Sequence, residues 1–174
     1  MNCRRIAING CLFLAILLAG CSLPPGSEPV NSRALDSRQE KIVLDKTYQD
    51  NRYHFQVSYP GKWPSKVDDN SLSDPLHGIY IYIDGNKDDF IYVYGSVSEL
   101  GIPDNGMIKS ELVTDDGVKG VLYSRTLDGR SDQHFVINER YCAHIQTTKV
   151  VNKKYHEVIV EILKSLKFST TDKK

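Results

Sequence analysis

The stretch GIYIYIDGNKDDFIYVYGSV, residues 78–97, decides the fold of this chain. Isoleucine or valine alternates with tyrosine on either side of a polar segment, and a period of two residues is typical of β-strands. Both runs are apolar on both faces, so we expect two central strands that are covered on each side. Residues 84–89 would form the hairpin connection between them.

Four tyrosines of this hairpin are the candidate binding residues. Directly opposed residues of an antiparallel pair point to the same face, so the register decides whether the four rings gather. Pairing of Asp84 with Phe90 would bring all four to one face, whereas a slip of one residue would mix tyrosine with isoleucine. The patch would then either stabilise the sheet beneath a helix or loop, or contact a protein partner or a glycan. The four residues are Tyr80, Tyr82, Tyr92 and Tyr94.

Similar alternation extends outward from the hairpin. Residues 53–59 place aromatic residues and valine on one face and polar residues on the other, and Pro60 and Gly61 end that strand. Residues 65–76 favour a loop with at most a short helix. The pattern as a whole predicts an antiparallel meander, with further strands at residues 109–114, 118–127, 133–138 and 141–150.

The last element is expected to be an amphipathic helix that docks on the sheet. Asn152 is its expected N-cap. Its apolar residues recur at three- and four-residue intervals, which places them on one stripe. They are Tyr155, Val158, Ile159, Ile162, Leu163 and Leu166.

The N-terminus carries an export pattern. Arg4 and Arg5 precede an apolar run over residues 12–19, which is shorter than the roughly 20 residues of a membrane-spanning helix. The tetrapeptide LAGC at residues 18–21 then resembles a bacterial lipobox, in which the cysteine thiol carries diacylglycerol. We therefore expect residues 1–20 to be a cleaved lipoprotein signal peptide and Cys21 to be lipidated.

The expected domain organisation follows from this anchor. Residues 21–46 begin with a Pro-, Ser- and Gly-rich run and are interpreted as the lipidated cysteine and a flexible tether. Residues 47–170 are interpreted as one folded domain. We expect it at the extracytoplasmic face of the cell membrane, or at the outer membrane if the cell has two.

Composition narrows the function further. The chain carries 22 basic and 22 acidic residues, so it lacks the positive charge typical of nucleic-acid binding. Beyond the expected leader and the acylated cysteine only Cys142 remains, which excludes a disulfide within the domain and favours a buried thiol. No GxSxG elbow or glycine-rich phosphate loop is present, and we expect no cofactor.

Two metal patterns are incomplete in the sequence. Residues 84–89 resemble the start of a calcium loop, but Asp89 stands where the pattern requires Gly and Gly95 where it requires Glu. His134, Cys142 and His144 would share a face if Asn138 pairs with Cys142, and could then form half of a zinc site. The alternative register separates them, and we expect no metal.

Two segments resemble one protein family. FQVSYPGKW at residues 55–63 matches the pattern F-x-x-x-Y-P-x-x-W, and ILKSLKF at residues 162–168 matches I-x-x-S-h-x-F, where h is apolar. Both resemble the ends of PsbP-like domains, which include many small bacterial lipoproteins. The resemblance implies an α+β fold, an antiparallel sheet flanked by helices as an α/β/α sandwich. It also implies accessory or assembly roles without a shared enzymatic activity.

These observations predict a lipid-anchored extracytoplasmic module that binds or assists assembly rather than catalysing a reaction. Its contact site would be the face that carries the four tyrosines, or the loops near Trp63 and at residues 84–89. One alternative is a metal-dependent hydrolase of the cell envelope that uses His134, Cys142 and His144. A second is a structural spacer.

Overall fold

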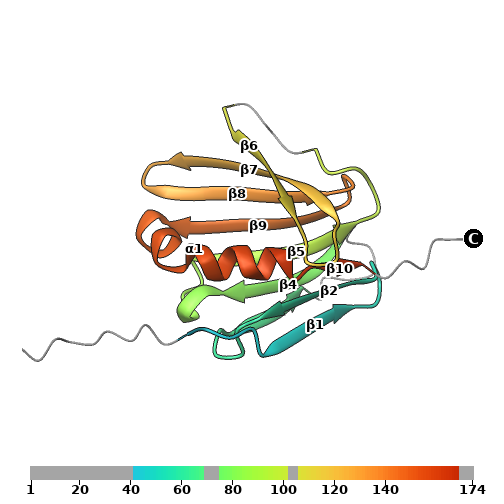
Figure 1. Ribbon diagram of the computed structural model, residues 1–174, viewed down its shortest axis with the longest axis horizontal. Coiled ribbons are helices and arrows are strands. Elements are labelled where there is room, and N and C mark those ends of the chain that lie inside the picture. Colours follow the sequence, from blue (N-terminus) through green and yellow to red (C-terminus); the bar gives the residue numbers. More distant parts are fainter. Residues whose placement is uncertain (1–40, 69–74, 102–105, 169–174) are drawn as a thin grey trace, which may run out of the picture. The chain divides into compact units, whose positions relative to one another are not determined.

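The computed structural model describes residues 41–68, 75–101 and 106–168 (Figure 1). Contacts divide the chain into two units, Met1–Gln39 and Glu40–Lys174. The predicted signal peptide, Cys21 and most of the predicted tether lie outside the described residues. The tether prediction extends too far, because Ile42 and Leu44 pack against the core and the first strand begins at Lys46.

The second unit consists of antiparallel strands and, among the described residues, one α-helix. Its strands are β1 (Lys46–Asp50), β2 (Phe55–Tyr59), β3 (Ser65–Asp68), β4 (Leu76–Tyr82), β5 (Phe90–Ser96), β6 (Ile108–Val113), β7 (Lys119–Leu127), β8 (Arg130–Ile137), β9 (Tyr141–Thr148) and β10 (Lys167–Phe168). A short 3-10 helix, η1 (Ile83–Gly85), lies within the β4–β5 connection, and α1 spans Lys149–Lys164. The predicted C-terminal helix is thus present, but the strands do not form the single meander that was predicted, because β5 pairs with β9 rather than with β6.

The strands form two sheets. The larger has seven strands in the order β3-β4-β5-β9-β8-β7-β6, and the smaller has three in the order β1-β2-β10. All pairs in both sheets are antiparallel. β3 replaces the loop that was predicted after residue 65, and β2 begins at Phe55 because residues 51–54 form a turn.

Helix α1 and the smaller sheet cover the same face of the larger sheet. Apolar residues of β2, β4, β5, β8 and β9 form one core cluster with Ile159, Ile162 and Leu163 of the helix. The predicted helical stripe is therefore confirmed. Its predicted N-cap is wrong: the Thr148 hydroxyl accepts a hydrogen bond from the Val151 N–H, and Asn152 lies inside the helix.

The described part of the domain has two layers. The α+β class and the antiparallel sheet are as predicted, but helices are not found on both faces of the sheet. The face of the larger sheet opposite α1 carries no described helix or strand. Among the described residues, no helix has the length and apolar character that crossing a membrane would require. The uncovered face of the larger sheet is called the outer face below.

Candidate functional site

The four predicted tyrosines lie on the outer face and stack in one row, here called the tyrosine ladder. Its order is Tyr82, Tyr80, Tyr92, Tyr94. Ring centroids are 6.3 Å apart for Tyr80 and Tyr82, 4.0 Å for Tyr80 and Tyr92, and 4.6 Å for Tyr92 and Tyr94. The middle pair is nearly parallel, with 6° between the ring planes. The hairpin thus places its isoleucines in the core and its tyrosines on the other side.

The observed register differs by two residues from the first of the two alternatives considered above, the pairing of Asp84 with Phe90. Tyr80 lies opposite Tyr92, and Tyr82 lies opposite Phe90. A shift of two residues preserves the face to which each side chain points, so the four rings gather on one face as in that alternative, although the individual pairs differ. Asp84 does not pair with Phe90 because η1 occupies the start of the connection.

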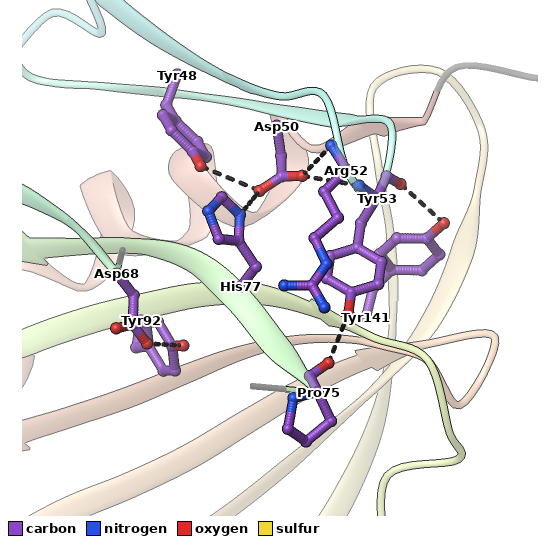
Figure 2. Close-up of polar contacts among 9 residues, drawn as sticks. All are labelled: Tyr48, Asp50, Arg52, Tyr53, Asp68, Pro75, His77, Tyr92 and Tyr141. Atoms are coloured by element: carbon purple, nitrogen blue, oxygen red, sulfur yellow. Dashed lines mark hydrogen bonds and ion pairs between the residues drawn. The ribbon is translucent and has the colours of Figure 1, made fainter. Parts of the chain in front are cut away.

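Packing within the ladder leaves its members unequally accessible. Tyr92 is 7% exposed, and its hydroxyl donates a 2.6 Å hydrogen bond to Asp68 of the edge strand β3, two strands away (Figure 2). Tyr80, Tyr82 and Tyr94 are half-buried. Burial, together with the nearby Cys142, raises the pKa of Tyr94, so its hydroxyl stays protonated. The ladder presents neutral, partly apolar surface.

A histidine pair continues the outer face beside the ladder. The β8–β9 register places His134 directly opposite His144, and Tyr92 opposes His144 from the other side. The imidazole centroids are 4.4 Å apart, with 6° between the ring planes. Both Nε2 atoms approach one oxygen of Asp132: Nε2 of His144 lies 3.0 Å from Oδ1 and Nε2 of His134 lies 3.2 Å from it. These three side chains are called the Asp132 cluster.

Electrostatics in the Asp132 cluster favour an ionised acid and a neutral His134. Burial opposes the charge on Asp132, but the hydrogen bond from Arg125 and the two histidines outweigh it and lower the pKa of the carboxyl. Nε and Nη2 of Arg125 lie 2.9 and 2.7 Å from the second oxygen, Oδ2. Burial, followed by repulsion from His144, lowers the pKa of His134.

Cys142 lies beneath this cluster as a buried thiol, as predicted. It is 1% exposed, and burial raises its pKa to about 12, so it remains a thiol rather than a reactive thiolate. Its Sγ lies 4.0 Å from Nδ1 of His134. The residue that joins the two histidines is therefore Asp132 rather than Cys142, which had been predicted in that place. Cys142 lies beside Nδ1 of His134 and does not face the Nε2 atoms.

A shallow hollow of about 370 Å³ adjoins the same face. Tyr123 and Val136 on β7 and β8 contribute to its lining, and the exposed acids Glu99 and Glu139 stand among the remaining lining residues. The hollow therefore combines an apolar wall with negative charge.

Trp63, predicted as a contact residue, lies inside the core instead. It is 1% exposed, and its ring packs edge-on against Tyr155 of α1 at 5.5 Å between centroids. Its indole cannot reach a partner in this arrangement. The tight turn after β2, in which the Trp63 N–H donates to the Pro60 carbonyl, directs the side chain inward.

The acidic connection at residues 84–89 is occupied by contacts within the protein. Asp89 is 1% exposed, and its carboxylate accepts hydrogen bonds from the Thr148 N–H at 2.5 Å and from Asn86 at 2.6 Å. Asp84 accepts one from the Tyr155 hydroxyl at 2.6 Å. These carboxylates hold the hairpin against α1, in agreement with the prediction that this segment is a hairpin connection.

A second polar cluster, absent from the sequence predictions, surrounds Asp50 (Figure 2). Oδ1 accepts the backbone N–H groups of Arg52 and Tyr53 at 2.9 and 2.7 Å. Oδ2 accepts the Tyr48 hydroxyl at 3.0 Å and lies 2.6 Å from Nδ1 of His77. Every contact serves to close the turn after β1 or to tie it to β4, which is a structural role.

Asp132 is the functional candidate that sequence reasoning missed. It stands two residues before His134 on the same strand, and this spacing places both side chains on one face. The signal was therefore present in the sequence. The metal-ligand pattern predicted from the sequence contains Cys142 in the place that Asp132 takes in the structure.

Comparisons with known proteins found matches among solved structures. No protein-family model and no curated protein sequence matches this chain. Among solved structures, it is similar to the solution structure of cyanobacterial PsbP (CyanoP) from Synechocystis sp. PCC 6803. The two share 14% identity with a TM-score of 0.48, over 78% of this chain and 99% of the other. This structural neighbour is PsbP-like, which agrees with the resemblance of residues 55–63 and 162–168 to the ends of PsbP-like domains.

Proposed function

We propose that this chain is a lipid-anchored extracytoplasmic module that binds a protein partner through its outer face. The observation that carries the proposal is the tyrosine ladder on a face that no described element covers. Tyrosine is enriched at protein interfaces because it offers a large apolar ring and a polar hydroxyl at a low cost in conformational entropy. The lipobox at residues 18–21 supports the anchored location.

The stacking within the ladder favours a protein over a glycan. A sugar packs its C–H groups on an open ring face, whereas Tyr80 and Tyr92 each lie between two neighbouring rings. The ladder therefore presents mainly ring edges, and edges suit the mixed apolar and polar contacts of a protein surface.

The adjoining hollow suggests one property of the partner. Glu99 and Glu139 would favour a basic side chain of the partner that inserts beside the apolar wall formed by Tyr123 and Val136. Binding without catalysis remains the proposed activity.

Site-specific photocrosslinking in living cells tests the proposal. A photoreactive amino acid in place of Tyr82 should give a discrete crosslinked protein, and the same probe in place of the exposed His156 on α1 should not. Glu139→Lys should reduce the yield of the Tyr82 adduct at least several-fold, whereas Glu157→Lys on the helix should leave it unchanged. Equal crosslinking from positions 82 and 156 would contradict the proposed surface.

A further inference from the structure

Three potential ligand atoms converge at the Asp132 cluster. Oδ1 of Asp132 lies 3.0 and 3.2 Å from Nε2 of His144 and of His134, and all three atoms lie within 4.8 Å of one another. In a tetrahedral zinc site with bonds of about 2.0–2.1 Å, ligand atoms are separated by roughly 3.3 Å. Two of the three separations therefore already approximate the edges of such a tetrahedron.

The strands that carry these residues restrict their movement. His134 and His144 are directly opposed in the β8–β9 ladder, and Asp132 lies two residues before His134 on the same face of β8. The side chains of Asp132, His134 and His144 are 20%, 16% and 27% exposed, so an ion can enter from solvent and then be largely enclosed. Ligands held on paired strands keep their geometry better than ligands on loops.

Neighbouring side chains orient the ligands without using the converging atoms. Arg125 binds Oδ2 of Asp132 and leaves Oδ1 facing the histidines. Sγ of Cys142 lies beside Nδ1 of His134, on the opposite side of the ring from Nε2. Metal-binding histidines commonly donate the second ring N–H to a carboxylate, a carbonyl or water, and here a weaker acceptor, the thiol sulfur, lies beside that nitrogen. The Arg125 charge opposes a bound cation, so this residue limits affinity while it positions the carboxylate.

We propose that Asp132, His134 and His144 form a binding site for one zinc ion on the outer face. Two imidazoles and one carboxylate are ligands that zinc accepts, and three protein ligands leave a fourth position for water or a partner's side chain. The site does not depend on the proposed protein partner, and each proposal can fail without the other. The competing explanation is a hydrogen-bonded cluster that stabilises the sheet and binds no ion.

Zinc titration of the full chain, purified in detergent without a histidine tag, separates these explanations. Competition with a chromophoric chelator should show one equivalent of zinc bound. His144→Gln and Asp132→Asn should each weaken binding at least about tenfold. His156→Gln, an exposed histidine on α1, should not change it. Arg125→Gln should preserve or tighten binding, because it removes a cation and no ligand.

A measurement on the unaltered chain covers the case in which a variant fails to fold. Nuclear magnetic resonance of the imidazole nitrogens should show zinc-dependent shifts of His134 and His144 alone among the five histidines. The proposal is overturned if no stoichiometric zinc binds, if His156→Gln weakens binding as strongly as His144→Gln, or if the shifts occur at other histidines. Loss of binding in Arg125→Gln together with retention in His144→Gln would equally overturn it.

Discussion

Asp132 organises the polar part of the outer face. One oxygen of its carboxylate contacts Arg125, and the other contacts both histidines. The side chain of Asp132 is only 20% exposed. A partly buried charge with several partners tends to be costly to disrupt, because removal of one partner leaves the others unsatisfied. The cluster therefore couples the protonation state of His134 to the stability of the sheet.

Acid is expected to destabilise the domain partly through His134. Because burial lowers its pKa, the folded chain takes up the proton less readily than the unfolded chain, whose histidine titrates near about 6.5. The stability contribution is complete above that value and is lost as the pH falls below it. Denaturant titrations with a chelator present should show the free energy of unfolding falling between about pH 7 and about pH 5.

The matched variants for this measurement are His134→Gln and His54→Gln. The first should flatten the dependence on pH, whereas the second changes an exposed histidine and should retain it. The same slope in both variants would rule out His134 as a source of acid sensitivity.

Among the elements, the faces of strands were predictable and their registers were not. Alternation assigned Tyr80 and Tyr92 to one face and their isoleucine neighbours to the other, because the period of a strand is two. The registers of both hairpins depend on turn geometry, which includes positive φ angles at Asp84, Asn138 and Glu139. Short sequences encode such non-glycine conformations weakly, so the sequence left both registers open, and the observed pairs differ by two residues from the alternatives that gather the side chains.

Short strands and the helix start were also missed for physical reasons. β3 has four residues and β10 has two, which is too few to establish a period. β1 is largely exposed and polar, so its sequence resembles a loop. Asn152 and Thr148 are both good N-cap residues, and only the end of β9 at Thr148 decides between them.

The β4–β5 pair has a position at which only glycine fits. A Cβ at Gly78 would lie 1.9 Å from the Val93 carbonyl oxygen and 2.7 Å from the Tyr94 Cα. Backbone atoms cannot yield as a side chain can, so Gly78→Ala should reduce the free energy of unfolding by about 1–3 kcal/mol or more. Gly101→Ala, where a Cβ meets nothing within 4 Å, should change it by less than about 0.5 kcal/mol. Chemical denaturation measures both, and equal stabilities would contradict the close strand approach.

On the scale of the whole molecule, the domain has one face filled by α1 and the smaller sheet and one face that no described element covers. A tethered protein with this asymmetry can present its outer face to another envelope component while the lipid holds it at the membrane. An acyl chain contributes roughly 0.8 kcal/mol per buried CH₂, so under the proposed lipidation the loss of the Cys21 thiol should release the protein.

Cys21→Ser tests the anchor independently of the outer face. The variant should lose lipid modification and leave the membrane fraction when cells are fractionated, and Cys142→Ser should remain membrane-bound because Cys142 is a core thiol. Continued normal processing and firm membrane association of Cys21→Ser would contradict the proposed lipidation.

The central claim is that the outer face binds a protein partner. Hydroxyl-radical footprinting tests this claim most directly. Labelling of Tyr80, Tyr82 and Tyr94 should be compared in intact envelopes and in detergent-purified protein, with His156 on α1 as the internal reference. We predict that the three tyrosines are protected several-fold in the envelope while His156 is labelled equally in both samples. Equal labelling of the tyrosines in the two samples would contradict the account.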